Sequence, residues 1–236
     1  MEYYYTPKRY ITPGELTITD DEAKHLARVL RKQSGEEIFV TDGEGNLYKC
    51  LINSVSREEI VCAIKENFFM LNEPELRINL YQSLIKNPDR LEFSIEKSVE
   101  LGVNSIHTVV TENTINKTTN KTERWQSIAL SAMKQSQRCV LPEVFQPVGF
   151  DEALRNSAAE LKLIADEKEL PGRIHLNDIP GDLRAIDIFI GPEGGFTPAE
   201  TESAAAKGFK ILDMGKRKYR SETAAILALC NLLKFR

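Results

Sequence analysis

The sequence lacks the features that mark membrane, secreted and zinc-binding proteins. No stretch of its 236 residues approaches the roughly 20 consecutive apolar residues that a membrane-spanning helix needs. The first residues, MEYYYTPKRY, do not have the basic-then-apolar layout of a signal peptide. The four cysteines form no C-x-x-C pair; they are Cys50, Cys62, Cys139 and Cys230. We therefore expect a cytoplasmic protein with reduced thiols and no metal site.

Common catalytic and phosphate-binding motifs are also missing. The histidines, His25, His107 and His175, form no H-E-x-x-H pattern, and there is no G-x-S-x-G. Neither a Walker A loop nor a G-x-G-x-x-G fingerprint is present, which disfavours an ordinary nucleotide-dependent α/β enzyme. The net charge is −4, so any contact with nucleic acid must come from a local basic patch.

What the chain does contain divides into two patterns. Residues 1–71 are rich in strand signals, at 37–41, 47–54 and 59–66, with a turn at Asp42–Gly45. A helix is predicted over 20–32, with Leu26, Val29 and Leu30 on one face. From residue 72 onward, strands and helices alternate, which predicts a mostly parallel sheet covered by helices. The expected strands are 76–85, 103–110, 161–165, 186–190 and 209–214, and the expected helices begin near 88, 122, 197 and 221.

The stretch IDIFIGPEGGFTPAE, residues 186–200, is the most informative part of the sequence. Its apolar beginning is typical of a central parallel strand. Thr197-Pro198-Ala199-Glu200 is a capping box that starts a helix immediately afterwards. The glycine-rich turn between them therefore lies at the carboxyl end of a central strand, where open α/β sheets bind ligands. The alternative is a tight turn that binds nothing.

A second loop follows the next strand, in the stretch MGKRKYRSETAA. It places Met214 and Gly215 at a strand end and then concentrates cations at Lys216, Arg217, Lys218 and Arg220. A solvated basic loop and a binding site for an anion or a nucleic acid both remain open at this point. The helix that starts at Ser221 is apolar on nearly all sides, so we expect it to be buried on more than one side, for example in a subunit interface.

These motifs together resemble the RsmE-type methyltransferases, which are SPOUT-fold enzymes that methylate N3 of a uridine in 16S ribosomal RNA of the small subunit. IGPEGGFTPAE followed by MGKRKYRSETAA resembles the C-terminal signature of that family. HLARVLR (25–31), EKSVELGV (96–103), RW (124–125) and AMKQSQRCVLPEV (132–144) resemble other family motifs in the same order. Two departures stand out: Asn113-Thr114 replaces a frequent Arg-Ser, and Tyr219 replaces a usual leucine.

The resemblance implies an α/β fold in two domains. Residues 1–71 would form a small PUA-like β-barrel that binds RNA, and residues 72–236 a SPOUT methyltransferase domain with a parallel sheet and a trefoil knot. It further implies a homodimer formed through the C-terminal domain and S-adenosyl-L-methionine as cofactor. The cofactor-binding positions carried over are Ile190, Gly191, Pro192, Glu193, Gly194, Gly195, Leu212, Met214, Gly215 and Tyr219. A third loop around Asp166 and Glu167 is a weaker assignment.

Methylation of uridine N3 requires loss of the N3 proton. Arg220 is the first candidate to stabilise the resulting anion. Glu222 or Glu193 could act as the base, although helix-end charge and turn geometry explain these two residues equally well.

The predicted RNA contacts are basic side chains. On a regular helix, Lys24, Arg28, Arg31 and Lys32 share one third of the circumference, opposite the apolar face. Arg138 and Arg217 complete the predicted set. Solvated surface charge is the alternative for the patch. For the whole chain, the alternative is a non-catalytic RNA-binding protein of ribosome assembly.

Overall fold

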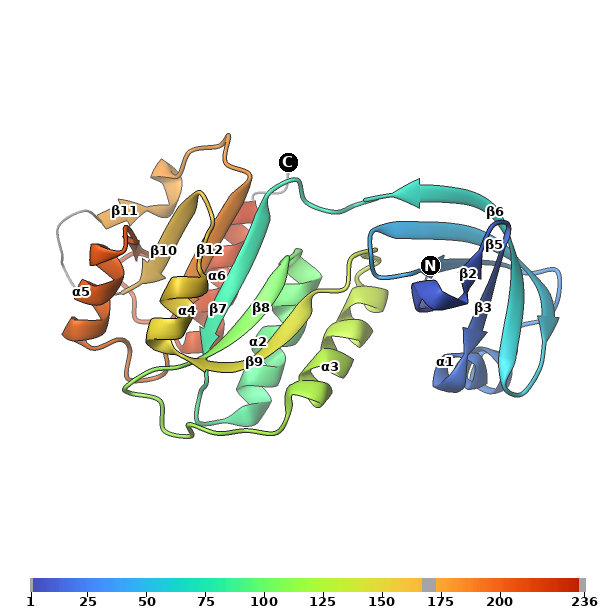
Figure 1. The fold of residues 1–236 in the computed structure, drawn as a ribbon, viewed down its shortest axis with the longest axis horizontal. Helices are drawn as coiled ribbons and strands as arrows, with labels where there is room; N and C mark the ends of the chain where they lie inside the picture. Colours follow the sequence, from blue (N-terminus) through green and yellow to red (C-terminus); the bar gives the residue numbers. More distant parts are fainter. Residues whose placement is uncertain (1, 167–172, 234–236) are drawn as a thin grey trace. The chain divides into compact units, whose positions relative to one another are not determined.

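The computed structural model describes residues 2–166 and 173–233, which fall into two units (Figure 1). The first unit consists of residues 1–73 and 133–141, and the second of residues 74–132 and 142–236. The sequence placed a boundary at 71/72 and assigned 133–141 to the second domain. The structure differs because 133–141 bonds to residues near the ends of β-strands in the first unit.

The first unit is built on a curled six-stranded sheet in the order β1-β4-β5-β6-β3-β2. Its strands are β1 (Tyr3–Tyr5), β2 (Ile11–Thr12), β3 (Glu15–Thr19), β4 (Glu37–Thr41), β5 (Asn46–Val55) and β6 (Glu59–Phe69). Thr6, just after β1, donates its hydroxyl to the carbonyl of Thr17 in β3 at 2.6 Å, so the curl brings the β1 side of the sheet to β3. The interior contains Leu16, Ile18 and Val40. The predicted strands β4 to β6 are confirmed, whereas β1 to β3 were missed because two of them are very short.

The helix predicted over 20–32 ends three residues early, at Val29, and is not a regular α-helix beyond Lys24. The α-helix α1 spans Asp20–Lys24 and continues as a π-helical turn over His25–Val29, in which the Leu30 amide donates to the His25 carbonyl at 3.1 Å. Each residue of a π turn rotates through a smaller angle about the helix axis than an α-helical residue does. The apolar and basic side chains that α-helical spacing would place on opposite faces therefore do not line up as predicted. Leu26 is buried, but Val29 is 66% exposed and Leu30 is 38% exposed. Arg31 lies beyond the helix with a left-handed φ of 53°.

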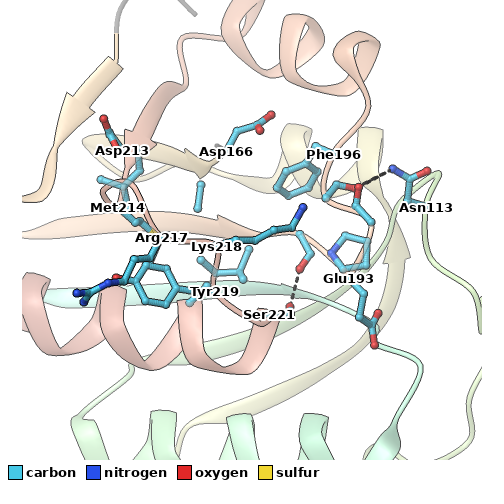
Figure 2. A pocket seen from close by; sticks show the side chains of 18 of the residues that line it. Asn113, Asp166, Glu193, Phe196, Asp213, Met214, Arg217, Lys218, Tyr219 and Ser221 are labelled. Carbon is cyan, nitrogen blue, oxygen red and sulfur yellow. Dashed lines mark hydrogen bonds between the residues drawn. The ribbon is translucent and has the colours of Figure 1, made fainter. Parts of the chain in front are cut away.

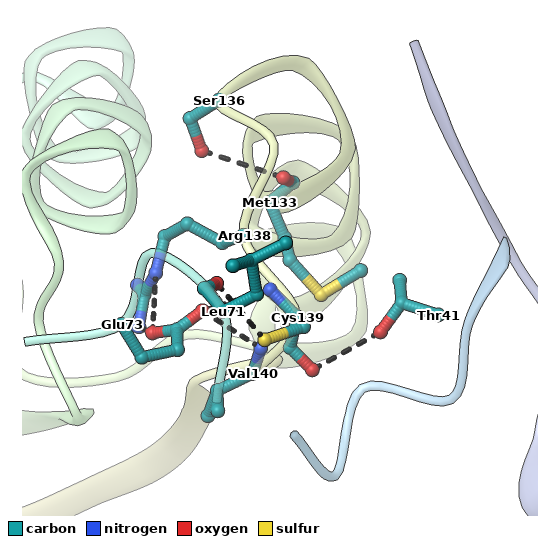
Figure 3. Close-up of polar contacts among 8 residues, drawn as sticks. All are labelled: Thr41, Leu71, Glu73, Met133, Ser136, Arg138, Cys139 and Val140. Carbon is teal, nitrogen blue, oxygen red and sulfur yellow. Dashed lines mark hydrogen bonds and ion pairs between the residues drawn. The ribbon is translucent and has the colours of Figure 1, made fainter. Parts of the chain in front are cut away.

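A buried ion pair fastens residues 133–141 to the first unit (Figure 3). One carboxylate oxygen of Glu73 accepts from Arg138 Nη2 at 2.7 Å and Nε at 3.1 Å. The other accepts from the amides of Cys139 and Val140, at 2.8 and 3.0 Å. The side chains of Arg138 and Glu73 are only 6% and 2% exposed. The Thr41 hydroxyl, at the end of β4, donates to the Cys139 carbonyl at 3.1 Å.

The second unit contains a seven-stranded sheet in the order β11-β13-β10-β12-β7-β8-β9, and every pair of neighbouring strands is parallel. The strands are β7 (Arg77–Ser83), β8 (Ser105–Val110), β9 (Glu143–Gly149), β10 (Leu161–Ala165), β11 (Arg173–His175), β12 (Ala185–Ile190) and β13 (Lys210–Asp213). The helices are α2 (Pro88–Leu101), α3 (Thr122–Gln135), α4 (Phe150–Asn156), α5 (Pro198–Ala206) and α6 (Ser221–Leu233). The predicted parallel α/β arrangement is confirmed. Strands β9 and β11 and helix α4 were missed.

The two faces of this sheet carry different helices (Figure 1). Helices α4 and α5 pack on the face that presents Tyr81, Val109 and Phe189. On this face the rings of Phe189, Tyr81, His107 and Phe145 stack across four neighbouring strands, with centroids 4.2 to 4.4 Å apart. Burial lowers the pKa of His107, so its ring stays neutral within the stack. Helices α2 and α6 pack against each other, and α6 contacts β7 and β12. None of the described helices combines the length and apolar character needed to cross a bilayer.

The Glu73–Arg138 pair predicts a large loss of stability in Arg138→Ala. Removing the guanidinium leaves a buried carboxylate without its cation, which typically costs about 3–5 kcal/mol. Urea denaturation should show this loss in the free energy of unfolding. Lys8→Ala is the matched control because Lys8 pairs with Glu44 on the surface, with side chains 67% and 55% exposed. It should lose less than about 1 kcal/mol. Equal losses in the two variants would contradict the buried-pair interpretation.

Candidate functional site

The register of the parallel sheet brings four loops to one edge. Ala165, the last residue of β10, pairs with Ile190 of β12 on one side and with Leu212 of β13 on the other. Ile190 in turn pairs with Gln82 of β7. Because these strands are parallel and end at nearly the same level, the segments that follow them meet at the carboxyl edge of the sheet.

A cavity of about 350 Å³ lies among these segments (Figure 2). All ten positions that the sequence assigned to the cofactor line it: Ile190, Gly191, Pro192, Glu193, Gly194, Gly195, Leu212, Met214, Gly215 and Tyr219. Asp166 also lines it, whereas Glu167 lies outside the described residues. The cavity has the size of a small-molecule site and mixed polar and apolar walls.

The glycine-rich turn is a compact wall of this cavity. The Gly195 amide donates to the Pro192 carbonyl at 2.9 Å, and Gly195 has a φ of +66°, which favours glycine. A Cβ on Gly191 would lie 3.2 Å from the ring of Phe196, so this position is sterically tight. The predicted capping box is confirmed: Thr197 accepts from the Glu200 amide, and Glu200 accepts from the Thr197 amide.

Asn113 is a wall residue that the sequence analysis did not assign to the site. Its carboxamide donates to the carbonyls of Gly194 and Gly195, at 3.2 and 3.0 Å (Figure 2). A Cβ on Gly194 would lie only 3.1 Å from the Cβ of Asn113. Asn113 thus clamps the outer side of the turn to the segment after β8. The only signal in the sequence was its departure from the family pattern.

Asp213 provides a second unassigned polar group at the cavity. Its carboxylate accepts from the Gly215 amide at 2.8 Å and lies 3.2 Å from Arg173 Nη2 and 3.4 Å from His175 Nδ1. Asp213 and Arg173 both line the cavity. The contact with Gly215, whose φ is +97°, fixes the start of the basic loop.

The residues proposed for catalysis occupy different environments. Arg220 is exposed and lies between Tyr219 and Ser221, which both line the cavity. Glu222 is only 8% exposed, and its carboxylate lies 3.7 Å from Arg90 Nε. Glu193 is exposed and accepts from the Lys86 amide at 2.9 Å. Of the two carboxylates, Glu193 is therefore the more accessible to a substrate.

The residues predicted to contact RNA are not all equally available. Arg28 and Arg31 are exposed, and Arg217 is exposed and lines the cavity. Lys24 and Lys32 pair with Asp21 and Glu36, each at 2.7 Å. Arg138 is buried against Glu73, which argues against a direct phosphate contact. Within residues 2–166 and 173–233, no group of three or more His, Cys, Asp or Glu side chains could hold a metal ion.

Comparison with known families identifies the class of protein. The RNA methyltransferase domain family matches residues 72–233, and the RNA methyltransferase PUA domain matches residues 18–65. The chain therefore belongs to the RNA methyltransferase family.

Three individual relatives that resemble this chain share one name. Ribosomal RNA small subunit methyltransferase E of Mesomycoplasma hyopneumoniae is 34% identical over 222 residues, covering 92% of this chain and 93% of the relative. The protein of the same name from Aquifex aeolicus is 29% identical over 100% of both chains. The crystal structure of this methyltransferase from Neisseria gonorrhoeae, bound to S-adenosyl methionine, has a TM-score of 0.88 and 33% identity. It covers 99% of this chain and 97% of its own.

Proposed function

We propose that the protein transfers a methyl group from S-adenosyl-L-methionine to N3 of a uridine in 16S ribosomal RNA. The observation that carries this proposal is the cavity at the carboxyl edge of β10, β12 and β13, because all ten positions predicted from two separate stretches of the sequence line it. The direct test compares ribosomal RNA from cells with and without the gene by mass spectrometry. Loss of a single 3-methyluridine is expected, and an unchanged content of that nucleoside would contradict the proposal.

The walls of the cavity fit this cofactor. A Cβ built on Gly195 or Gly215 would meet no atom within 4 Å, so both positions leave open space. Apolar contact from Leu212 and Met214 and nearby carboxylates at Asp166 and Asp213 suit a ligand with an apolar base, hydroxyl groups and positive charge. When bound, S-adenosyl-L-methionine supplies an electrophilic methyl group. The chain's part is to hold the reactants in line, which can contribute about 7–11 kcal/mol.

Arg220 is the residue we propose to stabilise the deprotonated uridine. Arg220 is exposed and does not itself line the cavity, but its neighbours Tyr219 and Ser221 do, and its guanidinium is a cation. A positive charge near O2 or O4 of the base favours the anion that forms when N3 loses its proton. Between the proposed bases, accessibility favours Glu193, while Glu222 is held against Arg90 and serves the start of α6.

RNA binding is assigned to Arg28 and Arg31 in the first unit and Arg217 in the second. Arginine suits this role because its planar fork matches phosphate geometry. Arg28 and Arg31 flank the exposed Val29 and Leu30 at the end of the π turn. The small ribosomal subunit, or its RNA, is the expected partner, and the expected compartment is the cytoplasm.

We further propose a homodimer formed through the second unit. On α6, Ile226, Leu227 and Cys230 are only partly buried within one chain, and Phe93 on α2 is 46% exposed. Apolar surface of this kind favours a subunit interface. The trefoil knot that the family resemblance implies stays a prediction.

The non-catalytic alternative makes a different prediction for the cavity. A binding protein of ribosome assembly has no need for a pocket with two left-handed glycines beside a basic loop. Calorimetry with S-adenosyl-L-methionine separates the two, since only the enzyme should bind it.

Gly195→Ala should weaken binding of S-adenosyl-L-methionine by at least about tenfold. The added methyl group would take up open space at the cavity wall, where the cofactor is proposed to bind. The left-handed backbone at this position adds about 1–2 kcal/mol of strain. Gly208→Ala is the matched control, because Gly208 also has a positive φ (82°) and open surroundings but does not line the cavity. Calorimetry should show normal affinity for Gly208→Ala and a similar thermal destabilisation of both variants. Equal affinities would remove the turn from the binding site.

Arg220→Ala should lower kcat by about 10²–10³ while changing cofactor affinity by less than about threefold. The loss reflects a charge that acts on the substrate anion rather than on the cofactor. Lys210→Ala, which removes an exposed cation at the amino end of β13, the end opposite the cavity, should retain kcat. Single-turnover methylation of a 16S RNA substrate compares the methyl-transfer rates of the two variants. Normal turnover in Arg220→Ala would exclude this residue from the chemistry.

The double charge reversal Arg28→Glu/Arg31→Glu should weaken RNA binding and reduce the slope of log K against log salt by at least about 1. Lys207→Glu/Lys210→Glu makes the same change in net charge around the amino end of β13, the end opposite the cavity. It should bind RNA with nearly normal affinity. Filter binding at several salt concentrations provides the measurement, and an unchanged slope in the first variant would refute the patch.

A further inference from the structure

A buried carboxamide lies directly behind the glycine-rich turn. Gln82, near the carboxyl end of β7, is 0% exposed and pairs in register with Ile190, the residue just before the turn. It does not line the cavity. Burying a carboxamide costs free energy unless its hydrogen-bonding groups find partners. The hydrogen bonds of Gln82 therefore indicate its structural role.

The contacts of Gln82 form a chain with a defined direction. The Ser94 hydroxyl on α2 donates to Gln82 Oε1 at 3.3 Å. Gln82 Nε2 donates to the hydroxyl of Ser221, the first residue of α6, at 2.8 Å, and to the Ser83 carbonyl at 3.2 Å. The Ser221 hydroxyl then donates to the carbonyl of Gly191, the first residue of the turn (Figure 2).

This direction dictates which side chain can stand at position 82. A carbonyl only accepts, so the single proton of the Ser221 hydroxyl is committed to Gly191. The group that faces Ser221 from behind must therefore donate. An amide NH₂ does this, whereas a carboxylate of the same shape cannot. Each donor in the chain also polarises the next, which strengthens the final bond to Gly191.

We propose that Gln82 is a positioning residue for the cofactor site, acting through Ser221 on the Gly191 carbonyl. This inference rests on the proposed function of the cavity. The chain holds the first peptide of the turn in one orientation before any ligand arrives, so binding does not have to order it. Helix α2 supports the same arrangement a second time, because its Arg90 lies 3.7 Å from Glu222, the residue after Ser221.

Gln82→Glu tests the direction of the chain. The carboxylate would accept the Ser221 proton and compete with Gly191 for it. We expect affinity for S-adenosyl-L-methionine, measured by calorimetry, to fall about tenfold, the effect of losing one hydrogen bond to a charge-free acceptor. KM for the cofactor should rise by the same factor, while kcat at saturating cofactor changes by less than about twofold. In the ligand-free protein, amide hydrogen exchange of residues 191–195 should become faster.

Gln82→Met keeps the experiment interpretable if a buried glutamate prevents folding. Methionine has a similar shape and no donor, so the Ser221 bond to Gly191 is weakened rather than redirected, and affinity should fall by about threefold. Ser98→Ala is the matched control, because the Ser98 hydroxyl on the same helix α2 is buried and has no hydrogen-bond partner among the described residues. It should leave affinity and exchange unchanged.

A double-mutant cycle separates positioning from general loss of packing. If Gln82 acts through Ser221, Gln82→Met should cause no further loss of affinity in a Ser221→Ala background. Additive losses, or normal affinity and exchange in both Gln82 variants, would overturn the inference. Failure of the unmodified protein to bind S-adenosyl-L-methionine would instead refute the proposed function, and the exchange measurement on ligand-free protein would still decide the role of Gln82.

Discussion

The site depends on the register of four parallel strands. Gln82, Ile190, Ala165 and Leu212 lie side by side at the carboxyl edge of the sheet, so every segment that leaves these strands starts from the same level. The loops that follow these strands can then enclose a ligand together, with backbone groups of the glycine-rich turn on one side and the side chains of Asp166 and Asp213 nearby. A shift of one residue in any of these strands would reverse its side chains between the two faces of the sheet. Gln82 would then leave the α2–α6 face for the face that holds the aromatic stack.

The positions that line the cavity could be predicted from the sequence because their signals are local. The apolar run of β12, the turn and the capping box at Thr197 are adjacent in the chain, and each restricts the backbone independently. The ten cavity positions followed from two such stretches and a family resemblance. Asn113 and Gln82 could not be found in this way, because their partners lie 81 and 139 residues away, respectively. A side chain that closes a long-range contact looks like any other polar residue in the sequence.

The errors in the first unit have a different origin. A regular helix was the natural prediction for 20–32, since its apolar and basic residues repeat at helical spacing. The π turn at His25–Val29 changes that spacing without a proline or glycine to announce it. The burial of Arg138 could not be foreseen for a related reason: its place in a family motif does not show whether its side chain is exposed, and its partner Glu73 stands 65 residues earlier. In both cases tertiary packing overrides the local pattern.

The inclusion of residues 133–141 in the first unit has a consequence for how the chain could evolve or be divided. The polypeptide passes from one unit to the other at 73/74, 132/133 and 141/142. Neither unit is therefore a contiguous cassette. A gene fragment that ends near residue 71 lacks both Glu73 and the segment 133–141 that Glu73 binds. One that begins near 72 carries that segment without the strands of the first unit. Recombination could exchange one unit only with breakpoints at several places in the gene at once. The two units are therefore expected to be inherited together.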